Sequence, residues 1–173
     1  MELLDLLGVA ANAAVIDVGG GASTLVDRLL DRGFSDVTVL DQSPAALNIS
    51  QQRVGEGRPV AWIVHELLSW APERRYDLWH DRAVLHFLAG AEIDTYLMLL
   101  DRALATDGAI ILGAFAPDGP QECSGLTTRR YAAGELALLL GARFEVVAQR
   151  RELHHTPGGV VQSFTWIAAR RKN

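Results

Sequence analysis

The sequence predicts an α/β fold: a doubly wound, mostly parallel sheet with helices on both faces and an antiparallel β-hairpin at its C-terminal end. Two observations favour this fold. Short apolar segments of strand length alternate with helical segments along most of the chain, which is typical of a parallel sheet. The end of the chain instead reads as two strands, 143–153 and 160–171, joined by a short loop at 154–159, which is typical of an antiparallel hairpin.

The first strand–helix unit begins at AVIDV, 14–18, an apolar run that stops at a glycine cluster. A helix is expected over 23–32. Ser23 can cap its first turn, and Gly33 can end it, because glycine readily adopts the left-handed conformation that often follows a helix. These punctuating residues set the expected bounds of the first unit.

The second strand is expected at 36–40. Ser43-Pro44 opens the next helix, since serine caps a helix N-terminus and proline suits the first helical position. The third strand is VAWIV, 60–64. It carries no charged residue, so we expect it in the centre of the sheet, buried on both faces.

The second half of the chain continues the alternation. The strand YDLWH precedes a long helix, and Asp107-Gly108 is expected to form a turn before the apolar strand AIILGAF. Gly141 is expected to end the last helix. The ranges expected for these elements are 76–80, 91–105, 109–115 and 133–140.

The composition restricts the class of function. The chain has 173 residues, 49% of them hydrophobic, which is enough for one domain with a sizeable core. A net charge of −5 argues against a nucleic-acid partner, which favours a basic face. No apolar run reaches membrane-spanning length, so we expect no membrane partner. The single cysteine excludes an internal disulfide framework, and the acidic N-terminal segment does not read as a signal peptide, so a cytoplasmic protein is expected.

One strand with an acid near its end precedes the glycine cluster, and the next strand along the chain ends in an acid. AVIDVGGG at 14–21 joins Asp17 to the glycines, and VTVLDQS places Asp41 at the end of the second strand. Glycines let the backbone turn sharply and approach a ligand closely. An acid at the end of the second strand can bind both ribose hydroxyls. The arrangement predicts a nucleoside-binding crevice, with a turn acid before Ser43 as the structural alternative for Asp41.

The same loop distinguishes between cofactors. A dinucleotide fingerprint, G-x-G-x-x-G, would need a glycine where this chain has Thr24, and usually keeps an apolar residue where it has Asp17. A buried carboxylate is costly unless it has a partner, so Asp17 is accounted for if it faces the crevice and binds the ammonium of an amino-acid moiety. The D-x-G-x-G pattern resembles motif I of class I S-adenosylmethionine-dependent methyltransferases. A dinucleotide binder and a glycine turn without a ligand are the alternatives.

This resemblance extends over the whole chain and implies a single Rossmann-like domain, 1–173, with seven strands in the order 3-2-1-4-5-7-6. Three stretches, YDLWHDRAVLHFL at 76–88, GPQECSGLTTRRY at 119–131 and HHTPGGVVQSF at 154–164, resemble a bacterial subfamily of small-molecule methyltransferases. Members of that subfamily usually carry an N-terminal segment over the active site. We expect that cap to be shortened here, because the first strand follows a single short helix.

The resemblance implies S-adenosylmethionine as the cofactor and S-adenosylhomocysteine as the product. The glycines would line the methionine half, and Asp41 would bind the ribose. Glu66 and the backbone of Leu67 would contact adenine, with an acid at a helix start as the alternative for Glu66. The expected cofactor-binding residues are Asp17, Gly19, Gly20, Gly21, Asp41, Gln42, Glu66, Leu67 and His80.

Three side chains are candidates for catalysis. Arg82 and His86 follow the fourth strand four residues apart, so on a helix they would share a face. They could hold an anionic acceptor, or His86 could take its proton. The alternative is a structural histidine, with Arg82 paired to Asp81 or Asp77. His154, in the expected hairpin loop, is a candidate general base because histidine titrates near neutrality.

Four further residues could contact the acceptor. Cys123 lies in a loop with proline, glycine and serine, where it could meet the acceptor or pack as a small buried hydrophobe. Arg130 and Tyr131 could supply an anion contact and an aromatic wall. His155 adjoins His154, but neighbouring side chains on a strand point in opposite directions, so no metal site is predicted.

These observations predict a methyltransferase that acts on a small molecule, with an anionic or thiol-like acceptor. A cofactor-binding module without turnover and a nucleotide-dependent oxidoreductase are the alternatives. A homodimer through the leucine-rich segment MELLDLLGV, 1–9, is also expected, unless these leucines pack on their own sheet.

Overall fold

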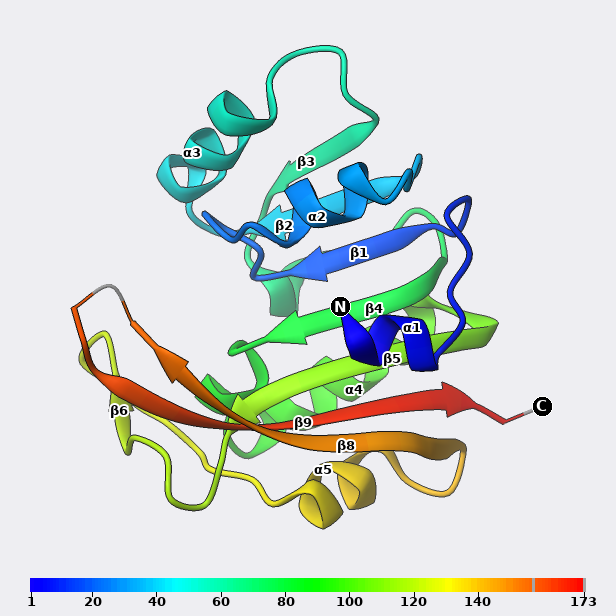
Figure 1. The fold of residues 1–173 in the computed structure, drawn as a ribbon. Helices are drawn as coiled ribbons and strands as arrows, with labels where there is room; N and C mark the ends of the chain where they lie inside the picture. The colour runs from blue at the N-terminus through cyan, green and yellow to red at the C-terminus, as the bar shows by residue number, and fades with distance from the viewer. Residues whose placement is uncertain (157, 173) are drawn as a thin grey trace.

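The computed structural model describes residues 1–156 and 158–172, which form an α/β fold around a seven-stranded sheet (Figure 1). The strand order, β3-β2-β1-β4-β5-β9-β8, confirms the predicted order, and only the labels of the last two strands differ. The strands of this sheet are β1 Val15–Val18, β2 Val37–Asp41, β3 Val60–Val64, β4 Tyr76–Arg82, β5 Leu104–Phe115, β8 Phe144–His155 and β9 Val161–Arg171.

The first five strands are parallel, whereas β9 is antiparallel to both β5 and β8. The predicted C-terminal hairpin is therefore confirmed. Two short strands, β6 Glu122–Cys123 and β7 Leu126–Thr127, pair with each other in a separate sheet. The seven-stranded sheet therefore passes from β5 to β9 and β8. Because parallel strands place their carboxyl ends at one edge of the sheet, ligands of such folds bind along that edge.

Helices cover both faces of the sheet, and a buried apolar cluster lies on each face. Leu3 of α1 and Leu29 of α2 belong to one cluster, and Leu99 of α4 and Leu136 of α5 belong to the other. Figure 1 shows α1 in front of the sheet and α4 behind it. The helices are α1 Glu2–Leu6, α2 Leu25–Asp31, α3 Pro44–Val54, α4 Ala91–Ala103 and α5 Ala133–Leu140, with single 3-10 turns η1 Leu67–Ser69 and η2 Leu85–Phe87.

Several predicted helix signals operate as expected. The hydroxyl of Ser43 accepts a hydrogen bond from the N–H of Ala46 at 3.2 Å, and Pro44 is the first residue of α3. Gly141 follows α5 with φ 75°, the left-handed region that glycine favours. Ser23 does not cap α2 as predicted. Its hydroxyl accepts from the N–H of Leu25, so the helix begins two residues later than expected.

The leucines of the N-terminal segment pack on their own sheet. Leu3, Leu4 and Leu7 are buried, whereas Leu6 is 55% exposed. The alternative of intramolecular packing therefore accounts for three of these side chains, and self-association stays a prediction. Among the described residues, no helix is long and apolar enough to cross a membrane.

The prediction that 60–64 is a central strand is wrong. β3 lies at one end of the sheet and pairs there with β2. Ala61 and Val64 are exposed, and the other three residues are only half-buried. The absence of charged residues indicates that both faces of a strand are apolar. It does not indicate whether one or two strands pair with it.

The expected hairpin loop and one expected turn are also corrected. β8 extends to His155, where His154 pairs with Gln162 and His155 with Val161, so both histidines lie on a strand. Asp107-Gly108 lies inside β5 rather than in a turn. Pairing with β9 continues through both histidines, although the residues around them favour a loop. Asp107 and Gly108 instead lie in an irregular part of β5, because Leu104 pairs with Tyr76 and the next paired residue is Ala109, opposite Leu78.

Candidate functional site

The loop after β1 can be built only with small residues. A Cβ on Gly20 would lie 2.6 Å from Oδ2 of Asp17, and one on Gly21 would lie 2.9 Å from Oδ2 of Asp41. Gly19 and Gly21 also have positive φ values, 67° and 39°. The N–H of Gly19 donates to the carbonyl of Leu40 at 2.8 Å, which ties the loop to the end of β2. The three glycines thus bring the backbone close to two carboxylates.

Asp41 has the turn role considered for it, and one of its carboxylate oxygens faces the glycine loop. Its Oδ1 accepts a hydrogen bond from the N–H of Ser43 at 2.8 Å, which shapes the turn into α3. Its Oδ2 faces the glycine loop, as the contact expected for a Cβ on Gly21 shows. A single carboxylate can therefore hold the turn with one oxygen and offer the other to a ligand.

A cavity of about 320 Å³ lies along the carboxyl ends of β1 to β4, and we call it the Asp41 cavity. Five expected cofactor residues line it: Gly19, Asp41, Gln42, Glu66 and Leu67. The remaining lining residues are Leu40, His65, Leu68, Arg82, Ala83, Val84, Phe87 and Leu88. Its walls are mainly apolar and include the acids Asp41 and Glu66, a combination that suits an uncharged base and a ribose.

Glu66 caps η1 as well as lining this cavity. Its two carboxylate oxygens accept hydrogen bonds from the N–H groups of Leu68 and Ser69, at 3.0 and 2.8 Å. Burial opposes the charge, but these hydrogen bonds prevail and the pKa of Glu66 is lowered. The helix-start role considered for Glu66 is therefore present, and its carboxylate stays ionised beside the cavity.

A second cavity, of about 310 Å³, adjoins the first, and we call it the His154 cavity. Gly19, Arg82 and Ala83 line both cavities. The lining residues are Asp17, Gly19, Gly20, Gly21, Ala22, Ser23, Arg82, Ala83, His86, Phe115, Cys123, His154, Gln162 and Phe164. All three candidate catalytic residues meet here, together with Cys123.

Arg82 and His86 meet in a different way from that predicted. Arg82 is the last residue of β4 and His86 lies in η2, so no shared helix face joins them. The guanidinium of Arg82 lies 5.1 Å above the ring of Phe164. The alternative ion pairs are not seen either, because Asp77 accepts from the N–H of Ala14 and Asp81 is occupied by other donors.

His86 is fully buried and stacks on Phe115 with ring centroids 4.2 Å apart. Its Nδ1 accepts a hydrogen bond from the N–H of Phe115 at 3.4 Å, so in a neutral ring the proton lies on Nε2. Within the described chain, Nε2 has no hydrogen-bond partner. Burial lowers the pKa of His86 to about 4. A neutral ring in this tautomer is a hydrogen-bond donor and a poor base.

His154 is better suited to accept a proton. It is half-buried, and its ring lies edge-on to Phe164 with centroids 6.2 Å apart. Burial and the nearby charge of Arg82 lower its pKa, so the imidazole is neutral at neutral pH. A neutral imidazole at a cavity wall can take a proton from a bound acceptor.

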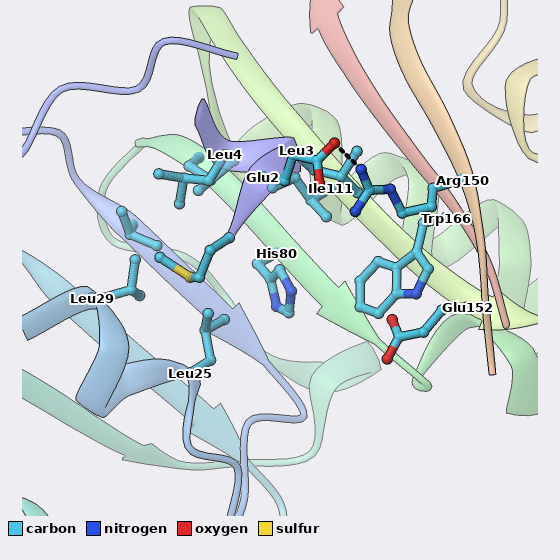
Figure 2. Close-up of a pocket in the computed structure, with 13 residues that line it drawn as sticks. Glu2, Leu3, Leu4, Leu25, Leu29, His80, Ile111, Arg150, Glu152 and Trp166 are labelled. Atoms are coloured by element: carbon cyan, nitrogen blue, oxygen red, sulfur yellow. Dashed lines mark ion pairs between the residues drawn. The ribbon is translucent and has the colours of Figure 1, made fainter. Parts of the chain in front are cut away.

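His80 lies behind the glycine loop rather than in either cavity. Its Nδ1 is 2.7 Å from Oδ1 of Asp17, and both side chains are buried. Figure 2 shows the imidazole among the residues of a third cavity of about 110 Å³, between Leu25 of α2 and Trp166 of β9. Glu2 of α1 and Arg150 of β8, which both line this cavity, form an ion pair. His80 therefore orients Asp17 and has no contact with either ligand cavity in this arrangement.

The remaining candidates lie apart. Arg130 and Tyr131 line a separate hollow, where Arg130 donates to the carbonyl of Pro117 at 3.1 Å and the ring of Tyr131 is buried in the core. His155 is exposed on β8. The expected substrate contacts of these three residues are not supported by their positions. Cys123 does line the His154 cavity, but from the short strand β6 rather than a loop.

Among the residues missed in the sequence are three that line the His154 cavity from β5 and β9. Phe115 ends β5, and Gln162 and Phe164 alternate on β9, where they face the His154 cavity. Alternation along the last strand was the available signal, because residues two apart share a face. Within residues 1–156 and 158–172, no group of three or more histidine, cysteine, aspartate or glutamate side chains could hold a metal ion.

Known proteins are similar to this chain in sequence and in fold. Residues 16–110 match the family described as Methyltransferase domain. Nodulation protein S of Rhizobium tropici is 29% identical over 116 residues, which cover 66% of this chain and 48% of that protein, so the match spans about half the length of this relative.

Several solved structures are similar over 99% of this chain, and two of them contain S-adenosylhomocysteine. The 1,6-didemethyltoxoflavin-N1-methyltransferase of Burkholderia thailandensis, solved with 1,6-didemethyltoxoflavin and S-adenosylhomocysteine, is 26% identical with a TM-score of 0.79, and 76% of its chain is covered. The N-methyltransferase NodS of Bradyrhizobium japonicum, solved with S-adenosylhomocysteine, is 18% identical with a TM-score of 0.79, and 85% of its chain is covered. The family match extends from β1 into β5 and includes the glycine loop and both acidic strand ends, and the chain belongs to the methyltransferase domain family.

Proposed function

We propose that residues 1–173 form one domain that transfers a methyl group from S-adenosylmethionine to a small-molecule acceptor. The observation that carries the proposal is the pair of adjoining cavities that share Gly19, Arg82 and Ala83. One cavity has the acids and apolar walls suited to a nucleoside. The other has ionisable groups suited to an acceptor. Methyl transfer is an in-line displacement, so its main requirement is that two ligands be held end to end.

The cofactor is assigned to the Asp41 cavity and the glycine loop. Asp41 would bind the ribose hydroxyls with the oxygen that faces Gly21. Adenine would lie beside Glu66 and Leu67. The methionine half would follow the glycines toward Asp17, whose buried carboxylate, held by His80, can bind an ammonium group. Both S-adenosylhomocysteine-bound relatives support this cofactor class.

The acceptor is assigned to the His154 cavity. His154 would take the proton, and the Nε2–H of His86 would donate to an oxygen or nitrogen of the acceptor. Arg82 would attract an anionic group, and Cys123 would contact the acceptor from β6. An anionic or thiol-like molecule fits these groups. The 1,6-didemethyltoxoflavin-N1-methyltransferase of Burkholderia thailandensis, solved with 1,6-didemethyltoxoflavin, supports a small-molecule acceptor.

Calorimetry with S-adenosylhomocysteine tests the cofactor assignment. Asp41→Asn keeps an oxygen for the N–H of Ser43 but removes the charge, so it separates ligand binding from the turn. We expect affinity to fall about tenfold or more, since a hydrogen bond to a charged group contributes about 1.5–3 kcal/mol. Asp31→Asn, at an exposed acid that ends α2, is the control and should bind like the native chain.

Three results would contradict the proposal. Equal binding by Asp41→Asn would remove Asp41 from the ribose site. Tighter binding of NADH than of S-adenosylhomocysteine would favour a dinucleotide enzyme. Binding without consumption of S-adenosylmethionine across a panel of thiols, phenols and heterocyclic amines would favour a cofactor-binding module without turnover.

A further inference from the structure

The loop Arg82–Phe87 forms the wall between the two ligand cavities, and its shape depends on one buried acid. Asp81 is fully buried at the end of β4. Its carboxylate accepts hydrogen bonds from the N–H groups of Val84 and Leu85, at 2.9 and 3.2 Å. These bonds fold the chain back directly after the strand and start η2.

The folded-back loop has a strained residue at its tip. Ala83 has φ 72°, a conformation that residues with a Cβ rarely adopt. Its N–H donates to the carbonyl of Gly113 at 2.8 Å. The side chain of Val84 packs so closely on Gly19 that a Cβ there would lie 2.2 Å from it. The hydrogen bonds to Asp81 thus hold a strained turn against the glycine loop.

A buried network holds Asp81 in turn. The hydroxyl of Tyr96 on α4 donates to Asp81 at 2.7 Å and accepts from the indole N–H of Trp79 at 3.1 Å. Burial raises the pKa of Asp81 to about 6, against the hydrogen bonds and the charge of His80. Three donors therefore converge on a carboxylate that takes up a proton close to neutral pH.

We propose that Asp81 is a positioning residue whose ionised carboxylate holds the Arg82–Phe87 loop in the shape that binds the S-adenosyl ligand. When Asp81 is protonated, one of its carboxylate oxygens becomes a hydrogen-bond donor, although two N–H groups and the hydroxyl of Tyr96 all donate to this carboxylate. The turn at Ala83 then loses hydrogen bonds that support it. This inference rests on the proposed function. It adds that cofactor affinity is linked to a proton on Asp81, a residue that touches neither cavity.

The test is the affinity for S-adenosylhomocysteine from pH 5 to 8. In the native chain we expect constant affinity above pH 7 and a loss of up to tenfold per pH unit below about pH 6, because the ligand selects the ionised form. Asp81→Asn should bind at least tenfold more weakly at pH 7.5 and show no such added loss in acid. Asp94→Asn, at an exposed acid of α4, is the control and should keep the native profile.

Other titrating groups near Asp81 need separate variants. Tyr96 on α4 donates to Asp81, and the neighbouring His80 on β4 acts on it through its charge. His86 lies further along the chain on η2, where it stacks on Phe115. Tyr96 has a pKa raised well above 10 by burial and by Asp81, and burial lowers that of His86 to about 4, so neither titrates near pH 6. His80→Gln should keep the acid loss if Asp81 causes it. Tyr96→Phe should weaken binding less than Asp81→Asn, because the N–H groups of Val84 and Leu85 still donate to an ionised carboxylate.

Hydrogen exchange of the Val84 and Leu85 amides gives a readout without ligand. At pH 7.5 we expect protection in the native chain and faster exchange in Asp81→Asn, with circular dichroism confirming that both are folded. Parallel pH profiles in the two proteins, or equal protection of these amides, would overturn the inference alone. Absence of S-adenosylhomocysteine binding by the native chain at every pH would overturn the proposed function and the proton linkage with it.

Discussion

Asp81 and His86 are close in the sequence, and both are buried. Burial shifts their pKa values in opposite directions. It raises the pKa of Asp81 from 3.8 to about 6 and lowers that of His86 from 6.5 to about 4, because in each case the charged form loses its hydration. Between pH 6 and pH 4, acid therefore relieves a cost of folding at Asp81. Over the same range acid removes stability through His86, which the unfolded chain protonates more readily.

The two effects nearly cancel in the native chain, so single variants should separate them. Relative to the native chain, Asp81→Asn should lose about 2 kcal/mol of unfolding free energy between pH 7 and pH 4.5, since His86 then acts unopposed. His86→Phe should gain a similar amount over the same interval. Urea unfolding at several pH values measures both. Identical pH dependence in the three proteins would show that the two shifts are absent.

At the scale of elements, the glycine loop joins β1 to α2 and needs glycine for space as well as for conformation. Gly20→Ala would place a Cβ 2.6 Å from Oδ2 of Asp17 and from the side chain of Val39. We expect a loss of about 1–3 kcal/mol in stability from the forced displacement, together with loss of S-adenosylhomocysteine binding. Thermal unfolding and calorimetry measure the two effects.

The control for this prediction is Gly134→Ala. Gly134 lies in the first turn of α5, and a Cβ there has no atom within 4 Å. This change should raise stability by about 0.5–1 kcal/mol, because alanine favours a helix more than glycine does. If Gly20→Ala instead matched Gly134→Ala in both stability and binding, the glycine loop would not be a ligand cradle.

The glycine loop could be predicted because its signals are local, whereas the strand order was implied by the resemblance to class I methyltransferases. The acid, glycine and apolar residues that specify β1 and its loop are adjacent in the sequence. The position of β3 at the end of the sheet depends on which strands pair, and VAWIV contains no such information. Similarly, His155 and His154 look alike in the sequence, and the continued pairing of β8 with β9 is what places them on opposite faces.

Prediction was weakest for the long connection after β5. Arg130 and Tyr131 follow Cys123 closely, yet Cys123 lies at the His154 cavity and the other two at a separate hollow. The N–H of Tyr131 donates to the carbonyl of Phe115 at 2.7 Å, which turns this segment toward the core. Such tertiary hydrogen bonds leave no periodic pattern in the sequence. The sequence indicates Asp81 only as a partner for Arg82, because its contact with Tyr96 depends on the packing of another element.

At the scale of the whole molecule, the charge of the chain separates a small acceptor from a nucleic acid. The net charge is −5, and the acceptor cavity holds one arginine among its lining residues. A small anionic acceptor held by Arg82 involves one or two ionic contacts, so its KM should change no more than about tenfold between 50 and 200 mM salt. A nucleic acid held by six to ten phosphate contacts would lose about 10³–10⁵ in affinity over that interval. Methyl-transfer assays at varied NaCl concentration, run beside assays with tRNA and duplex DNA as acceptors, make the comparison.

Arg82→Gln should raise the KM for an anionic acceptor and reduce the dependence of that KM on salt, because it removes the cation that attracts the acceptor. Methylation of nucleic acid with steep salt dependence would place the acceptor site on a surface other than the His154 cavity.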